Sequence, residues 1–182
     1  MSYDIWLKDP VTNERITIEE PHFMRGGTYA LGGTQELWLN ITYNYANYYY
    51  EATDGDDRFA HEEEYRDGTR TEYGIRGIYK KTGLESIPML EDMITRIRER
   101  YCPNGDWIKT ERTERKYIYG DGIEVDMFEA VKRGIEATEV KKIVSEGPSE
   151  RYWDDTAGNA IKPLYQLIAM AKMRPDGVWD GD

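Results

Sequence analysis

The stretch that decides the fold runs Glu36-Leu37-Trp38-Leu39-Asn40-Ile41-Thr42-Tyr43-Asn44-Tyr45. Its odd positions hold Leu37, Leu39, Ile41, Tyr43 and Tyr45, and its even positions are polar except for Trp38. This period of two predicts a half-buried β-strand of about ten residues. A helix that shares Trp38, Ile41 and Tyr45 on one face is the alternative. It is disfavoured because Asn44 and Asn47 are poor interior helix formers.

The residues before this strand predict a β-hairpin. Tyr3 to Lys8 alternates in the same way, with Ile5 and Leu7 on one face. The turn residues Asp9-Pro10-Val11-Thr12-Asn13 follow, and Arg15 to Ile18 is then expected to return as the second strand.

Helical spacing appears in three places after the strand. We expect one helix from a Ser86 cap, with Pro88 in its first turn, to about Arg100. A second is expected from an Asp126 cap through Val144, with a weak point at Gly134. The third is capped by Thr156 or Asp155, carries Pro163 inside, and ends at Pro175-Asp176-Gly177; residues 178–182 are expected to form a tail.

The segment patterns together predict an α+β fold. A small, mainly antiparallel sheet, made of the N-terminal hairpin and the strand near 36–45, packs with about three helices. We expect a single domain over residues 1–182, since no linker or large repeat divides the chain. Residues 53–72 form an acidic excursion, with a short helix expected around His61 to Tyr65, and residues 103–149 form an inserted segment. Within the insertion, one hairpin is expected: Trp107–Glu111 with Lys116–Tyr119, or Arg115–Tyr119 with Ile123–Val125.

Composition and charge exclude several classes of protein. The 182 residues include 24 Lys and Arg against 35 Asp and Glu, a net charge of −11, which argues against a general coat for nucleic acid or anionic membrane. The single Cys102 excludes an internal disulfide and a multi-thiolate zinc site. Without an apolar run of membrane-spanning length or a secretory signal, the expected location is a reducing cytoplasm.

Metal-binding and catalytic motifs are not apparent. His22 and His61 lie far apart in the sequence, and Asp54-Gly55-Asp56-Asp57 lacks the later Gly and Glu of a calcium loop. We therefore expect no metal and no cofactor. Cys102 follows a predicted helix end, where nothing visible lowers its pKa. A non-enzymatic protein is expected, although 35 acidic residues leave paired-carboxylate catalysis open.

Two kinds of side chain indicate binding. Five of the 15 tyrosines fall within eight residues, and the adjacent Tyr48, Tyr49 and Tyr50 cannot all face one core. At least one is therefore expected to be exposed, as at a protein interface. Residues 53–72 carry eight acidic residues against three arginines, a net charge of −5 that suits a basic partner.

Two further segments are candidates for contact with an anion or nucleotide. Arg25, Gly26 and Gly27 begin a Gly-Gly-Thr near-repeat, although a glycine-rich connection between strands explains it more simply. Residues 96–116 carry a net charge of +3, and Arg112 and Arg115 in this stretch could contact DNA. The simpler interpretation is a mixed surface.

Several blocks that frame the chain resemble small proteins encoded by gut bacteriophages and prophages. They are Tyr3-Asp4-Ile5-Trp6-Leu7, Arg25-Gly26-Gly27-Thr28-Tyr29-Ala30, Trp38-Leu39-Asn40-Ile41-Thr42-Tyr43-Asn44-Tyr45, Gly158-Asn159-Ala160 and residues 174–182. The chain also resembles type II-A anti-CRISPR proteins, which antagonise a Cas9-type nuclease. The proteins it resembles are shorter and lack much of 53–72 and 103–149. The resemblance therefore implies nothing about the function of these two segments.

The resemblance implies a non-enzymatic inhibitor that binds the guide-loaded, RNA-guided nuclease of a type II CRISPR system and blocks DNA engagement or cleavage. Such nucleases have basic channels that carboxylates could occupy. The contacts we expect are Asp54, Asp56, Asp57, Glu62, Glu63, Glu64 and exposed members of Tyr48, Tyr49 and Tyr50. The alternatives are a phage sponge that binds a nucleotide immune signal through Arg25, Gly26 and Gly27, and a protein that contacts DNA through Arg112 and Arg115.

Overall fold

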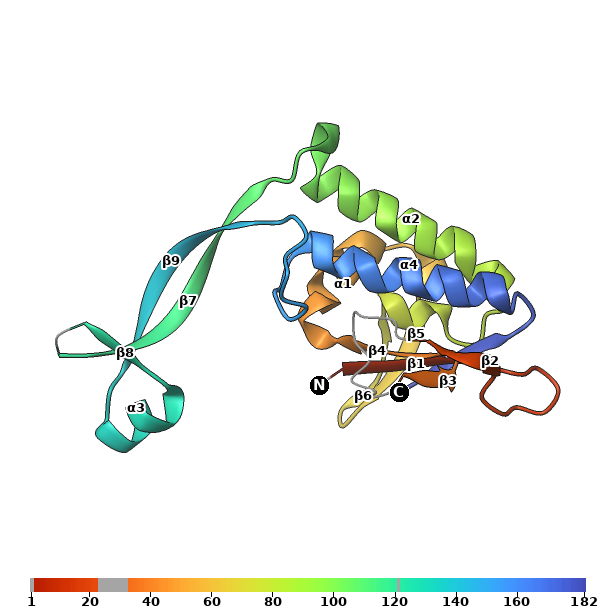
Figure 1. Ribbon diagram of the computed structural model, residues 1–182, viewed down its shortest axis with the longest axis horizontal. Coiled ribbons are helices and arrows are strands. Elements are labelled where there is room, and N and C mark those ends of the chain that lie inside the picture. The colour runs from red at the N-terminus through yellow and green to blue at the C-terminus, as the bar shows by residue number, and fades with distance from the viewer. Residues whose placement is uncertain (1, 23–32, 121) are drawn as a thin grey trace.

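A three-stranded antiparallel sheet forms one layer of the body of the molecule (Figure 1). The computed structural model describes residues 2–22, 33–120 and 122–182. Strand β1 (Ser2–Lys8) lies between β10 (Val178–Gly181) and β4 (Trp38–Thr42), and Ile5 pairs with both Leu39 and Gly181. The odd-numbered side chains of β1 are buried, as their alternation predicts.

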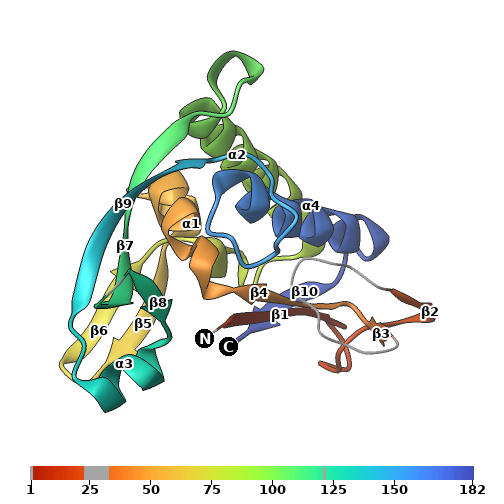
Figure 2. The same cartoon turned by 60° about the vertical axis from the view of Figure 1, so that its left-hand side comes forward.

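Three helices form the second layer, against one face of this sheet (Figure 2). They are α1 (Ala46–Thr53), α2 (Gly83–Tyr101) and α4 (Ala157–Met173). Thr82 and Glu85 form a capping box at the start of α2, and the Thr156 hydroxyl accepts the Asn159 backbone N–H at the start of α4. The apolar faces of the helices and sheet share one core.

Two smaller pairs of strands lie at the edges of the body. Strand β2 (Thr17–His22) pairs with β3 (Thr34–Glu36), and β5 (His61–Tyr65) pairs with β6 (Gly68–Glu72). Short 3₁₀ helices cover Tyr43–Tyr45, Asp57–Phe59, Ile75–Ile78 and Pro103–Gly105. Among the described residues, no helix is long and apolar enough to cross a membrane.

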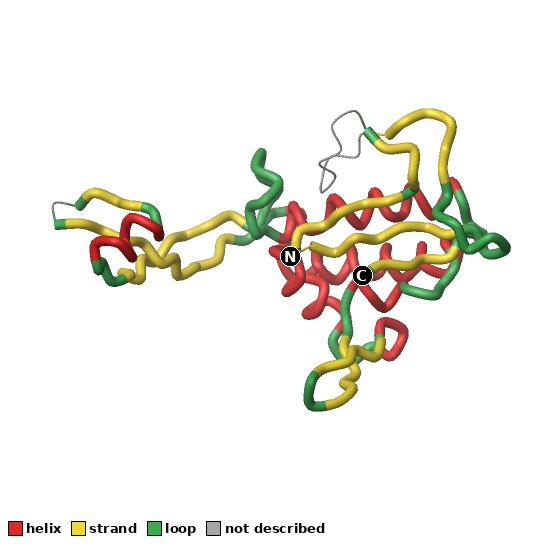
Figure 3. The backbone as a smooth tube through the Cα atoms, turned by 90° about the horizontal axis from the view of Figure 1, so that it is seen from below, coloured by secondary structure: helices red, strands yellow, loops and turns green. Residues whose placement is uncertain are grey.

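Residues 109–145 form an arm that extends away from the body (Figures 1 and 3). Its shaft is a two-stranded ribbon in which β7 (Lys109–Tyr119) pairs with β9 (Ala137–Ser145), from Lys109 opposite Ser145 to Tyr117 opposite Ala137. The tip adds β8 (Ile123–Val125), which pairs with the end of β7, and helix α3 (Met127–Arg133). The arm and the β5–β6 hairpin leave the body in different directions (Figure 3).

The α+β class and the antiparallel sheet are confirmed, but the N-terminal hairpin is wrong in its partners. Beyond an isolated bridge between Lys8 and Arg15, β1 pairs with β4 and β10. Residues 178–182 were expected to be a tail, but they contain β10, which forms one edge of the three-stranded sheet. Trp179 explains the change, because its buried indole N–H donates to the Ser86 hydroxyl at 2.7 Å.

Several predicted element boundaries are also wrong. The strand near 36–45 ends at Thr42, whose side chain caps the next turn by accepting the Asn44 N–H. The helix expected through Val144 ends at Arg133, because Gly134 adopts a left-handed conformation (φ 66°), and β9 follows. The short helix expected around 61–65 is strand β5. Helix α2 begins at Gly83 with Thr82 as its cap, rather than at Ser86. Of the two hairpins weighed for the insertion, the one with Ile123–Val125 is present.

Candidate functional site

Polar side chains from four segments meet at Glu146, where the arm joins the body. The Glu146 side chain is almost fully buried and accepts hydrogen bonds from Tyr48 Oη at 2.7 Å and Arg112 Nη2 at 2.8 Å. It also accepts from the Thr110 hydroxyl and from the Ala157 backbone N–H at the start of α4. Glu146 therefore ties β7, α1 and α4 to the base of β9.

The electrostatics of this junction favour an ionised Glu146. Burial alone would raise the pKa of Glu146, but hydrogen bonds from Thr110, Arg112 and Tyr48 outweigh it and hold the pKa below its ordinary value. Asp155 lies 2.9 Å from Arg112 Nη1, yet burial raises its pKa. Both carboxylates share one guanidinium, and the better hydrogen-bonded of them holds its charge more firmly.

The junction brings together two predicted binding residues, Tyr48 and Arg112, but uses them within the fold. Arg112 Nη2 donates to Tyr48 Oη at 2.5 Å as well as to Glu146. A cavity of about 360 Å³ lies beside these groups. Because Arg112 is already paired with both Glu146 and Asp155, its assignment to DNA contact is not supported by its placement.

The prediction that at least one of the three adjacent tyrosines is exposed is wrong. Tyr48 and Tyr49 are buried, and Tyr49 Oη donates to the Ala160 carbonyl at 2.9 Å, so neither is available as a surface anchor. This corrects their assignment to partner contact. Their helix α1 turns both side chains into the core, whereas Tyr50 remains half-buried at the surface.

The acids before the β5–β6 hairpin differ in their availability. Asp54 and Asp57 are exposed, but Asp56 is held by Arg58 and by Arg96 Nη2 at 2.7 Å. The hydrogen bond from Arg58 makes the largest contribution to holding the pKa of Asp56 well below its ordinary range. The charge of Asp56 is therefore balanced within the fold.

The acids of the hairpin itself are split between two faces. Glu62 and Glu64 are exposed on one face of β5, while Glu63 points to the other and accepts from Arg76 Nη1 at 2.7 Å. The predicted acidic surface is thus reduced to Asp54, Asp57, Glu62 and Glu64.

The predicted anion contacts are not gathered into one site. Arg25, Gly26 and Gly27 lie outside the described residues. Arg115 is exposed and pairs in register with Glu139, and the described part of the chain gives it no ion pair. Residues 2–22, 33–120 and 122–182 also contain no cluster of His, Cys, Asp or Glu suited to a metal ion.

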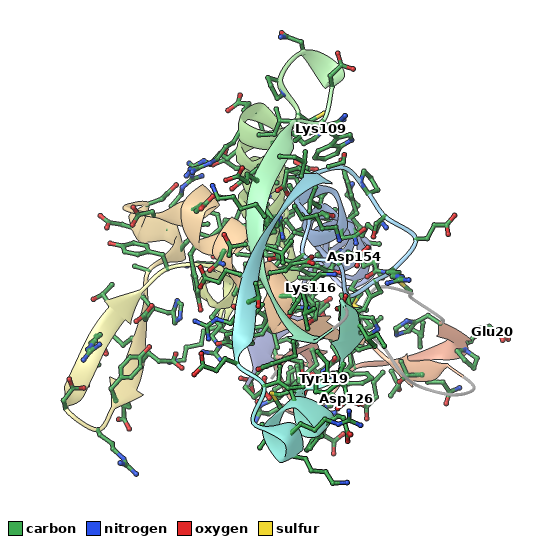
Figure 4. All side chains as sticks on the ribbon, turned by 90° about the vertical axis from the view of Figure 1, so that its left-hand side faces the viewer. Glu20, Lys109, Lys116, Tyr119, Asp126 and Asp154 are labelled. Atoms are coloured by element: carbon green, nitrogen blue, oxygen red, sulfur yellow. The ribbon has the colours of Figure 1, made fainter. Side chains whose placement is uncertain are left out.

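Several exposed apolar side chains lie at the tip of the arm, and the sequence prediction missed them. Phe128 is 82% exposed, Val131 75%, Ile123 57% and Met127 55%. The inner face of α3 holds the buried Ala130, so Phe128 and Val131 point outward, and Met127 in the first turn is exposed as well. Lys109, Lys116, Tyr119 and Asp126 mark the course of the arm from base to tip in Figure 4.

A signal for this surface was present in the sequence. A helix was expected from the Asp126 cap through Val144, but glycines at 120, 122 and 134 confine it to about two turns. So short a helix with Met127, Phe128 and Val131 cannot bury all three against a narrow ribbon.

The charge of the molecule is carried by the body. Residues 109–145 contain eight basic and eight acidic residues, so the net −11 belongs to the rest of the chain. The basic stretch 96–116 is divided between α2 and β7. Four of its seven basic residues pair with acids: Arg96, Arg100, Arg112 and Lys116. A neutral arm with an apolar tip therefore projects from an acidic body.

Comparison with protein-family models, with curated proteins and with solved structures found no match for the chain. The arm and the acidic body must therefore be interpreted from their own geometry.

Proposed function

We propose that the protein is a non-enzymatic inhibitor that binds a partner protein through the tip of its arm. The partner implied by the resemblance is the guide-loaded, RNA-guided nuclease of a type II CRISPR system. The observation that carries the proposal is the exposed cluster of Ile123, Met127, Phe128 and Val131 at the end of the projecting arm.

The size and position of this cluster suit a protein interface. Its four side chains are each at least 55% exposed and lie in one short stretch of the chain, and an exposed apolar patch is often an interaction site. A standard interface takes about 800 Å² from each partner, so the tip would supply its centre. Phe128, the most exposed member, suits an anchor that enters a pocket on the partner.

The acidic body complements a basic partner. Nucleases of this class hold their heteroduplex in a positively charged channel. Carboxylates such as Asp54, Asp57, Glu62 and Glu64 would raise the rate of encounter with such a surface. Charge would then guide association, while the apolar tip would slow dissociation.

The test combines capture of the guide-loaded nuclease with a DNA-cleavage assay. We expect the unaltered protein to bind and to inhibit cleavage, and Phe128→Asp with Val131→Asp to weaken binding at least tenfold. Leu84→Asp is the matched control, because Leu84 is 65% exposed on the body and an acid is tolerated in the first turn of α2.

Two results would contradict the proposal in different ways. Full cleavage at excess protein, with no capture, would reject the nuclease as the partner. Capture that is equally strong for the tip variant and the Leu84 control would reject the arm as the binding element.

A further inference from the structure

A pocket of about 380 Å³ opens between α1 and the end of β6. Its lining consists of Tyr50, Glu51, Asp54, Glu72 and Tyr73. Two aromatic rings and three carboxylates therefore share one cavity, and no lysine or arginine is among its described lining residues.

The surroundings hold one wall of this pocket in place. The Tyr50 ring lies over Gly74, where an added Cβ would come within 2.9 Å of ring atoms Cδ1 and Cε1. Tyr3 Oη donates to Tyr50 Oη at 3.4 Å. Since Tyr50 is fixed by both contacts, a ligand would meet a preformed ring face rather than a mobile one.

The carboxylates are incompletely balanced by the protein. Glu51 lies 3.3 Å from Arg100 Nε, and Glu72 accepts from Tyr65 Oη at 2.9 Å. Asp54 is exposed and has no ion pair with any described residue. One cation thus serves three acids, so a further cation would be attracted to the cavity.

The same hairpin already displays this type of contact. The Arg70 guanidinium lies 4.9 Å from the centre of the Tyr65 ring, and the Tyr65 hydroxyl binds Glu72. An arginine stacked on tyrosine beside a carboxylate is therefore compatible with the local geometry. The planar guanidinium suits both partners, because it stacks on aromatic faces and pairs with carboxylate oxygens.

We propose that this pocket receives an arginine side chain presented by a partner protein, stacked between Tyr50 and Tyr73 and paired with Asp54 and Glu72. The inference rests on the proposed function, because the proposed partner would supply the arginine that enters the pocket. It places a specific cation-binding pocket on the body, beside α1 and the end of β6.

The test is an NMR titration with N-acetyl-arginine methylamide and with its neutral isostere, N-acetyl-citrulline methylamide. We expect saturable shifts of the amides lining the pocket with arginine and none that saturate with citrulline. The pair Asp54→Asn and Glu72→Gln should weaken arginine binding at least fivefold, while Glu20→Gln, at an exposed acid on β2, should not. An equal response to both ligands, or an unchanged response of the double variant, would overturn the proposal.

The titration needs no nuclease, so its failure is distinct from failure of the proposed function. Arginine binding without nuclease capture would reject only the nuclease as partner. Nuclease capture that survives unchanged in the Asp54 and Glu72 double variant, with no arginine shifts, would reject only the pocket.

Discussion

Arg112 and Arg115 lie three residues apart on β7, and the structure gives them different roles. Both were predicted to contact an anion. Even-numbered residues near the base of β7 are partly buried against the body, whereas odd-numbered ones are exposed. Arg112 therefore reaches the buried Glu146, while Arg115 points to solvent. Strand alternation, rather than local charge density, decides which arginine is structural.

Arg112→Ala is expected to lower the free energy of unfolding by about 3 kcal/mol, because it leaves Glu146 buried without its cation. The matched Arg115→Ala should change stability by less than about 0.5 kcal/mol, as an exposed substitution does. Urea unfolding followed by circular dichroism measures both. Equal effects of the two substitutions would contradict the junction described at Glu146.

Glu146 also predicts how stability depends on pH. Its folded pKa lies below its ordinary value of 4.5, so the unfolded chain takes up the proton first as the pH falls. The stability that Glu146 contributes is present above about pH 4.5 and is lost as the pH falls through its lower folded pKa. The difference in unfolding free energy between the unaltered protein and Glu146→Gln should therefore shrink below that pH.

Asp155 should change stability with pH in the opposite direction to Glu146. Its folded pKa lies above 3.8, so its protonation favours the folded state as the pH falls. As the pH falls through the pKa of Asp155, the free energy of unfolding of the unaltered protein should rise relative to that of Asp155→Asn. Over the same acidic range, it should fall relative to that of Glu146→Gln. Parallel curves for the two variants would be inconsistent with these assignments.

The elements of the arm make a unit that the body does not need for its core. None of the described residues between 109 and 145 belongs to the main hydrophobic core. The two ends of the arm are close, since the Glu146 N–H donates to the Ile108 carbonyl at 2.9 Å. The body therefore has its own apolar interior, and the arm is a projection carried by the Glu146 junction.

Replacement of residues 114–140 by Asn-Gly should leave the body folded. The change keeps Arg112 and the pair of Thr113 with Lys141, and Asn-Gly suits a two-residue turn between them. We expect cooperative thermal unfolding with a melting temperature within about 5 °C of the unaltered protein, because the core is intact. Binding to the partner should be lost. A shortened chain that fails to fold would show that the arm contributes to the body after all.

The sequence predicted those elements that have a strong local signal and missed others, such as β5 and β10. Alternation in β1, the Asp126 cap of α3 and the Thr156 cap of α4 all appear where expected. Strand β9 was missed because Val140, Ile143 and Val144 also fit a helical period. Only pairing with β7 separates the two possibilities for that segment.

At the scale of the whole molecule, body and arm should differ in local stability. A two-stranded ribbon with exposed faces opens more readily than a sheet covered by helices. Amides in the middle of β7 and β9 should exchange with deuterium at least about a hundredfold faster than those of β1. Mass spectrometry of peptides from a deuterium time course measures the difference.

Binding of the partner gives this experiment a second readout. If the tip is the interface, exchange in α3 should slow in the complex while that of β1 stays the same. Uniform protection across body and arm in the free protein would show that the two do not open independently.

The sequence by itself determined the α+β class, most of the capping and turn positions, and a net charge of −11, because these follow from composition and short-range periodicity. Only the tertiary structure decided that Tyr48 and Tyr49 are buried, that Arg112 serves Glu146, and that an apolar cluster is exposed at the tip of the arm. These outcomes depend on which segments pack together. A side chain's role is set by the neighbours that reach it, and in this chain Tyr48 and Glu146 are 98 residues apart.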